Sequence, residues 1–340
     1  MRIATYNVEW FANLFDEDGA LLRDTGWSGR RDVKRYQQIE ALGEVFRAMD
    51  ADAIMVIEAP DSSRFRSGRD ALETFARHFN LRTNKAVIGF RNDTQQEIML
   101  LYDPSVLSAC HDPIGPETAK AGQAIPPRFD GVFHIDLDVD ATADSIQFSK
   151  PPLELQIETD RSAFRMIGVH AKSKAPHGAR GAAEVMRISI ANRRKQLAQC
   201  IWLRRRVEQH LEAKDPLIVL GDFNDGPGLD EYEKLFGRSG VEIVLGEQKG
   251  VQLYDPHAEM ALNRRLGAAP VTSRFYIAHQ KRYLQALLDY VMVSPDLRAK
   301  APVWRIWHPF DDPECYDKPS FREALLTASD HFPVTIDIDL

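Results

Sequence analysis

Short apolar runs recur along the chain, and most of them end in a polar or charged residue. Runs with the composition of β-strands occupy residues 2–8, 52–58, 97–103, 153–158, 164–170, 216–222, 287–294 and 333–340. In the last run Val334, Ile336, Ile338 and Leu340 alternate with polar residues. Strict alternation of this kind predicts a strand with one buried face.

Helical patterns separate several of these runs. Apolar residues three or four positions apart form stripes within 39–49, 72–79 and 200–211, which predicts amphipathic helices. Helices between strands, with further strands near the end of the chain, predict layered sheets covered by helices. Residues 104–150 and 299–328 are rich in proline and charge, and we expect long loop insertions there.

Composition narrows the class of protein. Of the 340 residues, 44% are hydrophobic and 27% are charged, which is typical of a globular protein with a sizeable core. The cysteines Cys110, Cys200 and Cys315 are scattered and odd in number, which argues against a disulfide framework and a cysteine-ligated zinc site. Neither a signal peptide nor a membrane-length apolar run is visible, so we expect a cytoplasmic protein without a membrane span.

Charge is distributed unevenly along the chain. The net charge is −7, yet residues 161–206 contain twelve Lys or Arg and one acidic residue, Glu184. Such a segment could form a docking face for a polyanion. It could equally be the solvated side of a helix, and the sequence leaves both interpretations open.

Acids, amides and histidines gather where the apolar runs end. These residues are Asn7, Glu9, Glu58, His170, Asp222, Asn224, Asp289, Asp330 and His331. In an extended chain residues two apart face the same side, so Asn7 pairs with Glu9 and Asp222 pairs with Asn224. Carboxylates without cysteines are the ligands of a hard cation such as Mg²⁺ or Mn²⁺, and a histidine beside acids suits phosphoryl chemistry.

Several of these stretches carry a resemblance to a known family. They are "TYNVEWF", "KPPLELQI" followed by "GVHAKSK", "GDFND" and "SDHFPV". In this order, from Asn7 to His331, they resemble the endonuclease/exonuclease/phosphatase superfamily of DNase I-like metal-dependent phosphodiesterases. The resemblance implies a four-layer α/β sandwich, with two packed mixed β-sheets flanked by helices and residues 1–340 folded as one domain.

The resemblance also implies a metal site and an activated water. Glu9 and Glu58 would bind a Mg²⁺ or Mn²⁺ ion, with Asp330 joining them directly or through water. Asp222 would orient and deprotonate the attacking water. The family often has glutamine before the second metal-binding glutamate, where this chain has Ile57, so the side chain for a supporting hydrogen bond is missing.

Further residues would support the base and contact the phosphate. Asn7 and Asn224 would hold Asp222 by hydrogen bonds. His331 would contact the scissile phosphate, while Asp289 would fix the imidazole ring and keep it charged.

A basic wall completes the implied site. His170 would be a second phosphate contact, and Lys172 and Lys174 would extend the positive surface. The alternative for His170 is a core histidine, and the alternative for the two lysines is a solvated sheet edge.

Together these observations predict a metal-dependent hydrolase that cleaves phosphodiester bonds by in-line attack of water. Nucleic acid is the expected substrate because of the basic segment 161–206, and no obligate protein partner is inferred. One alternative is an enzyme for a small-molecule or lipid phosphate, although the inositol polyphosphate 5-phosphatases are disfavoured because "GDFNDGPG" and "LLDYVMV" lack their arginines. A catalytically silent scaffold is least favoured, since the catalytic set is complete.

Overall fold

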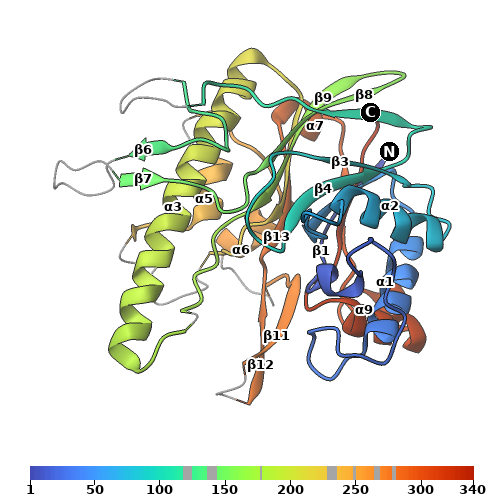
Figure 1. Cartoon of the computed structure of the whole chain (residues 1–340). Coiled ribbons are helices and arrows are strands. Elements are labelled where there is room, and N and C mark those ends of the chain that lie inside the picture. Colours follow the sequence, from blue (N-terminus) through green and yellow to red (C-terminus); the bar gives the residue numbers. More distant parts are fainter. Residues whose placement is uncertain are drawn as a thin grey trace.

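The computed structural model places two β-sheets face to face between layers of helices. It describes residues 1–117, 125–135, 144–176, 178–227, 236–247, 250–263, 269–277 and 281–340. Figure 1 shows the layers in order: the long helix α3, one sheet, the other sheet, and then helices α1, α2 and α9. This is the predicted four-layer arrangement.

The first sheet contains both ends of the chain. Its order is β14 (Val303–Ile306), β15 (Val334–Asp337), β1 (Arg2–Asn7), β2 (Ala53–Ala59), β4 (Glu97–Tyr102) and β3 (Lys85–Ile88). β1 runs parallel to β2, and the other pairs are antiparallel, so the sheet is mixed.

The second sheet is also mixed. Its order is β13 (Asp289–Val293), β10 (Leu217–Asp222), β9 (Ala163–His170), β8 (Leu153–Thr159) and β5 (Leu107–His111). β9 and β10 are parallel neighbours. Two separate hairpins pair β6 (Phe133–Ile135) with β7 (Asp144–Ile146), and β11 (Ser273–Ile277) with β12 (Arg282–Ala286).

Helices cover the outer face of each sheet. They are η1 (Phe11–Leu14), α1 (Arg35–Met49), α2 (Gly68–His78), α3 (Ala182–Ala213), α5 (Gly240–Leu245), α6 (Pro256–Leu262), α7 (Pro295–Arg298), α8 (Pro313–Tyr316) and α9 (Pro319–Ala328). The apolar stripes of α1, α2 and α9 form one core with the first sheet. Residues of α3 and α5 form a second core with the second sheet. None of the helices in the described ranges is both long enough and apolar enough to cross a bilayer.

A third core fills the space between the sheets. Val334, Ile336 and Ile338 lie in it, which confirms the alternation predicted for the last strand. Gly168 of β9 sets the spacing at one point, because a Cβ at this position would lie 2.4 Å from the sulfur of Met55 in the opposite sheet. A side chain there would force the sheets apart.

Two stretches differ from the loop insertions expected for them. Residues 104–150 contain β5, β6 and β7, although residues 118–124 and 136–143 lie outside the described part of the chain. Residues 299–328 form β14, α8 and α9. The prolines that suggested irregular chain, Pro313 and Pro319, occupy the first turn of α8 and α9, where a missing N–H leaves no helical hydrogen bond unmade.

Candidate active site

The carboxyl ends of the parallel strands from both sheets meet at one end of the sandwich. β1 ends at Asn7, opposite Ile57 of β2, while Asp222 at the end of β10 lies between His170 of β9 and Asp289 of β13. The Nδ2 of Asn7 donates a hydrogen bond of 3.0 Å to Oδ2 of Asp222. One hydrogen bond therefore joins the two sheets where their polar ends converge.

Asp222 is held by three hydrogen bonds. Besides Asn7, its carboxylate accepts from the backbone N–H of Asn224 at 2.7 Å and from Nδ2 of Asn224 at 3.0 Å. The side chain of Asn224 also donates to the carbonyl of Ala171, and its backbone φ of 49° gives the tight turn that this contact needs. Burial raises the pKa of Asp222 to about 7, so the carboxylate can accept a proton near neutral pH.

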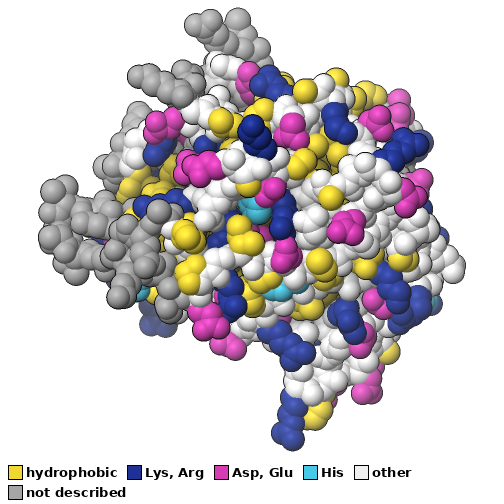
Figure 2. Space-filling model, turned by 90° about the horizontal axis from the view of Figure 1, so that it is seen from above, with side chains coloured by type: hydrophobic (Ala, Val, Ile, Leu, Met, Phe, Trp, Pro, Cys, Tyr) yellow, Lys and Arg dark blue, Asp and Glu magenta, His cyan; other side chains and the backbone are white. Residues whose placement is uncertain are grey.

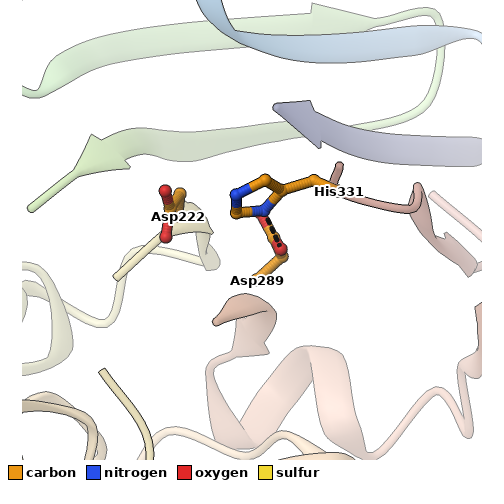
Figure 3. A group of neighbouring side chains, drawn as sticks. All are labelled: Asp222, Asp289 and His331. Carbon is orange, nitrogen blue, oxygen red and sulfur yellow. Dashed lines mark hydrogen bonds and ion pairs between the residues drawn. The ribbon is translucent and has the colours of Figure 1, made fainter. Parts of the chain in front are cut away.

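His331 faces Asp222 and is bonded to Asp289. Nδ1 of His331 lies 2.7 Å from Oδ2 of Asp289, and Figure 3 shows the ring between the two carboxylates. The hydroxyl of Thr272 accepts a hydrogen bond from the backbone N–H of Asp289 and fixes that strand end. Burial disfavours the charged ring, but the charge and hydrogen bond of Asp289, with the charge of Asp222, hold the pKa of His331 well above its usual value.

These three side chains could also be considered as a metal site. Asp222, Asp289 and His331 each offer a ligand atom, and these atoms lie within 4.8 Å of one another. The hydrogen bond to Asp289 and the raised pKa of His331 favour an imidazolium between the two carboxylates when no metal is bound.

His170 lies on the opposite side of Asp222. Its Nε2 is 3.6 Å from Oδ2 of Asp222 and 3.9 Å from Oε1 of Glu58. The ammonium of Lys150 lies 3.3 Å from Nδ1 of the same ring. Burial, reinforced by the charges of Lys150 and His331, holds the pKa of His170 well below its usual value, so this ring is neutral.

Glu58 projects from a β-bulge at the end of β2. The register shifts between Ile57 and Ala59, and Glu58 has a positive φ of 60°. Ile57 packs in the core between the sheets, so this position supports the bulge by packing alone. Burial raises the pKa of Glu58 to about 7, while Lys150 opposes the shift and Asp330 adds to it.

Glu9 and Asp330 share a cation that the chain itself supplies. The guanidinium of Arg30 forms an ion pair with Oε2 of Glu9, and its Nη1 lies 3.9 Å from Oδ1 of Asp330. Even so, burial and then the charge of Asp330 raise the pKa of Glu9 to about 7. The Oδ1 of Asp330 is buried and has no hydrogen-bond partner among the described residues.

Glu9, Glu58 and Asp330 carry the kind of donor atoms that a divalent cation takes. These oxygens are hard ligands, which Mg²⁺ and Mn²⁺ prefer. Two of the three carboxyl groups have raised pKa values, mainly because they are buried and in addition because the charge of Asp330 lies nearby. A bound cation would compensate their negative charge and give the orphaned Asp330 oxygen a partner.

The two predicted lysines lie in different surroundings. Lys174 forms an ion pair with the fully buried carboxylate of Asp225, which also accepts from the backbone N–H of Gly240. This contact anchors the turn after β10. Lys172 is partly exposed, and burial followed by the charge of Lys195 lowers its pKa.

The basic segment 161–206 is mostly neutralised within the fold. Among the described residues, its ion pairs with acidic residues are Arg165–Asp112, Lys174–Asp225, Arg187–Glu184, Arg193–Asp225, Arg194–Asp144, Arg204–Glu208 and Arg206–Glu154. At least seven of its twelve cations thus have acidic partners, so its composition gives no argument for a docking face. On the face shown in Figure 2, basic and acidic side chains are interspersed over the described surface.

A pocket opens beside Glu58. It has a volume of about 230 Å³ and is lined in part by Trp10, Phe11, Gln95 and Gln96. Trp10 is 44% exposed and donates from its indole N–H to Glu9. Of the three carboxylates Glu9, Glu58 and Asp330, Glu58 is the one that lines this pocket.

Sequence reasoning assigned no role to Lys150, Arg30 or Thr272. Lys150 opens the "KPPL" stretch, so its position before a strand was a usable signal. Arg30 and Thr272 lie in irregular segments, and no sequence pattern marks them.

Comparisons with known proteins show the family. The sequence matches the model of the Endonuclease/Exonuclease/phosphatase family over residues 4–331. Among curated proteins, none matches this sequence.

Solved structures show the same fold at low sequence identity. Truncated TDP2 of Caenorhabditis elegans is 12% identical, with a TM-score of 0.50, and the alignment covers 98% of this chain and 96% of that chain. A family protein of Bacteroides thetaiotaomicron is 14% identical, with a TM-score of 0.51 and coverage of 100% and 98%. TDP2 of D. rerio, complexed with a single strand DNA product, is 10% identical, with a TM-score of 0.51 and coverage of 100% and 99%.

Proposed function

Because the chain belongs to the endonuclease/exonuclease/phosphatase family, we propose that it is a Mg²⁺- or Mn²⁺-dependent hydrolase of phosphodiester bonds, with nucleic acid as the substrate. The observation that carries the proposal is the position of Asp222 between the amides of Asn7 and Asn224, facing the imidazolium of His331. A proton acceptor and a fixed positive charge are the two groups that in-line attack on phosphorus needs.

The residues then take complementary roles. Asp222 would orient the attacking water and remove its proton, helped by a pKa of about 7. His331, kept charged by Asp289, would donate a hydrogen bond to a non-bridging phosphate oxygen and offset the charge that develops there. Neutral His170 and the ammonium of Lys150 would bind the phosphate from the other side.

Glu9, Glu58 and Asp330 would hold the divalent cation. When bound, the cation neutralises phosphate charge and helps to position the substrate. Arg30 already spans two of these carboxylates and would share them with the ion or withdraw.

Support for a nucleic-acid substrate does not come from the basic segment 161–206, since its charges are largely paired. The same fold accommodates a single strand DNA product in D. rerio TDP2. For this chain, the support is the basic and aromatic hairpin that rises beside His331, considered below.

Hydrolysis of bis(p-nitrophenyl) phosphate with Mg²⁺, with Mn²⁺ and with EDTA tests the proposed chemistry. We expect turnover with the metals, none with EDTA, and none in Asp222→Ala with either metal. A substrate panel of single-stranded and duplex DNA, RNA, inositol phosphates and phospholipid then tests the substrate class. A folded protein without metal-dependent turnover would exclude the hydrolase and favour a silent scaffold.

A further inference from the structure

The β11–β12 hairpin projects away from the sandwich at the end where the polar strand ends meet. Figure 1 shows its two strands extending beyond the body of the molecule. Its base is built into the site: Ser273 forms a β-bridge with His331, and the backbone N–H of Arg274 donates to the carbonyl of Asp330 at 2.7 Å. The hairpin is therefore fixed in position relative to the imidazolium.

One face of this hairpin carries aromatic rings and a guanidinium. Tyr276 lies opposite Tyr283 in the register, and Arg274 lies opposite Gln285, so these four side chains share a face. The two tyrosine rings are 5.3 Å apart. The guanidinium of Arg274 lies 3.8 Å from the centre of the Tyr283 ring.

A second cation extends this face. The guanidinium of Arg31, from the loop before α1, lies 3.5 Å from the centre of the Tyr276 ring and is also paired with the exposed carboxylate of Asp32. Residues 269–277 and 281–286 contain three basic residues, Arg274, Lys281 and Arg282, and no acidic residue. The Nε of Arg274 is buried and has no hydrogen-bond partner among the residues that the structure describes.

We propose that this face, formed by Arg31, Arg274, Tyr276 and Tyr283, binds a single-stranded nucleic acid that extends from the phosphate held at His331. The inference rests on the proposed function and adds to it the site that recognises the polymer. Rings that can stack on unpaired bases, placed between cations that can contact phosphates, are what a single strand requires. Tyr283 is 48% exposed, so one of the rings is open to a base.

Charge favours a nucleic acid over a lipid surface. A membrane-binding hairpin would expose apolar side chains, whereas Phe275, Ile277 and Leu284 of this hairpin are partly buried on its other face. The exposed residues in its described strands are Arg282, Tyr283 and Gln285. Burial of apolar side chains is therefore not the main contribution that the β11–β12 hairpin would make to binding.

The test is fluorescence anisotropy with a short labelled single-stranded oligodeoxynucleotide in EDTA, where no cleavage can occur. Tyr276→Ala and Tyr283→Ala should each weaken binding about fivefold or more, the loss expected for one stacked base. Tyr276→Phe and Tyr283→Phe keep the rings and should bind close to wild type. Tyr316→Ala is the matched control, because Tyr316 is 51% exposed and lies 4.9 Å from the Arg322 guanidinium on another part of the surface.

Melting temperatures show whether each variant is folded. Unchanged affinity in both folded alanine variants would overturn the inference, as would an equal loss in Tyr316→Ala. A duplex that binds more tightly than the single strand, or binding to anionic phospholipid vesicles in place of the oligonucleotide, would also overturn it.

Hydrolysis of bis(p-nitrophenyl) phosphate by the wild-type protein separates this inference from the proposed function. Turnover without oligonucleotide binding would support the hydrolase function and overturn the proposed binding role of the β11–β12 hairpin. Oligonucleotide binding that depends on Tyr276 and Tyr283, without turnover, would support the binding role of the hairpin and exclude the hydrolase function.

Discussion

The side-chain amide of Asn7 donates a 3.0 Å hydrogen bond to Asp222, although the two residues belong to different sheets and lie 215 positions apart in the chain. The carboxylate that we propose as the general base is therefore oriented from both halves of the sandwich. Asn7→Ala removes the donor contributed by the first sheet. We expect kcat to fall by about ten- to a hundredfold, as for other groups that orient a reactive side chain, with little change in KM. A change confined to KM would contradict this positioning role.

Asp222→Ala should abolish turnover while the protein stays folded. A general base contributes roughly 10²- to 10⁴-fold to a rate, and no other described carboxylate faces His331 in the same position. The melting temperature should not fall much, because burial already disfavours the Asp222 carboxylate and raises its pKa to about 7. Asp160→Ala, on the surface, is the control. Wild-type turnover in Asp222→Ala would show that another group takes the proton.

The Asp289–His331 pair should make stability depend on pH. Asp289 holds the folded-state pKa of His331 above the unfolded value of about 6.5. The resulting stabilisation is fully present below about pH 6.5 and is lost as pH rises through the folded-state pKa. Asp289→Asn should therefore be less stable than wild type at low pH, and the difference should narrow at higher pH. Thermal unfolding in EDTA across this range measures it, and a difference independent of pH would disagree.

Arg30→Gln should increase the affinity for Mn²⁺ several-fold. Arg30 neutralises Glu9 and approaches Asp330, so it competes with a metal ion for the same oxygens. The variant should also melt at a lower temperature than wild type in EDTA, since two carboxylates lose their cation. Arg30→Lys keeps the charge and is the control. Isothermal titration calorimetry gives the affinities, and equal Mn²⁺ affinity in wild type and Arg30→Gln would rule out the competition.

Arg206→Met should destabilise the fold without affecting nucleic-acid binding. The guanidinium is fully buried, bonded to Glu154 at 2.8 Å and to the carbonyls of Pro126 and Pro127. Breaking a buried pair costs about 3–5 kcal/mol, because Glu154 loses its guanidinium partner and keeps His210, whose Nε2 lies 3.3 Å from its Oε1. The double variant with Glu154→Leu should recover part of the loss. Chemical denaturation measures both variants. Exposed Arg187→Ala is the control, and oligonucleotide affinity lost in folded Arg206→Met would restore a docking role for the basic segment.

The layers of the fold could be predicted because each depends on a local pattern. The alternation in the last strand and the apolar stripe of α1 could be recognised in the sequence, and both elements pack in the cores that these patterns predict. The strands β11 and β14 were not predicted. β11 is short and mixes cations with aromatics, and the prolines around β14 favoured a loop, while the contacts that order both strands come from distant segments.

The candidate site could be predicted only as a set of residue types. The order of the motifs placed Asn7, Asp222 and His331 in one predicted site, but the distances between them depend on how the two sheets pack. Lys174 shows where composition misleads: a cation near a catalytic turn looks available for phosphate until its buried partner Asp225 is seen. Arg30 shows the converse, since a loop residue without any pattern contacts the predicted metal ligands.

The bulge at Glu58 lowers the stability of the fold at a position that we propose as a metal ligand. A side chain in the left-handed region costs about 1 kcal/mol or more, and here it also carries a carboxylate out of water. Glycine at position 58 would relieve both penalties at once, and would remove a proposed metal ligand in the same step. The positive φ and the buried carboxylate of Glu58 are therefore both costs to stability at a position that we propose as a metal ligand.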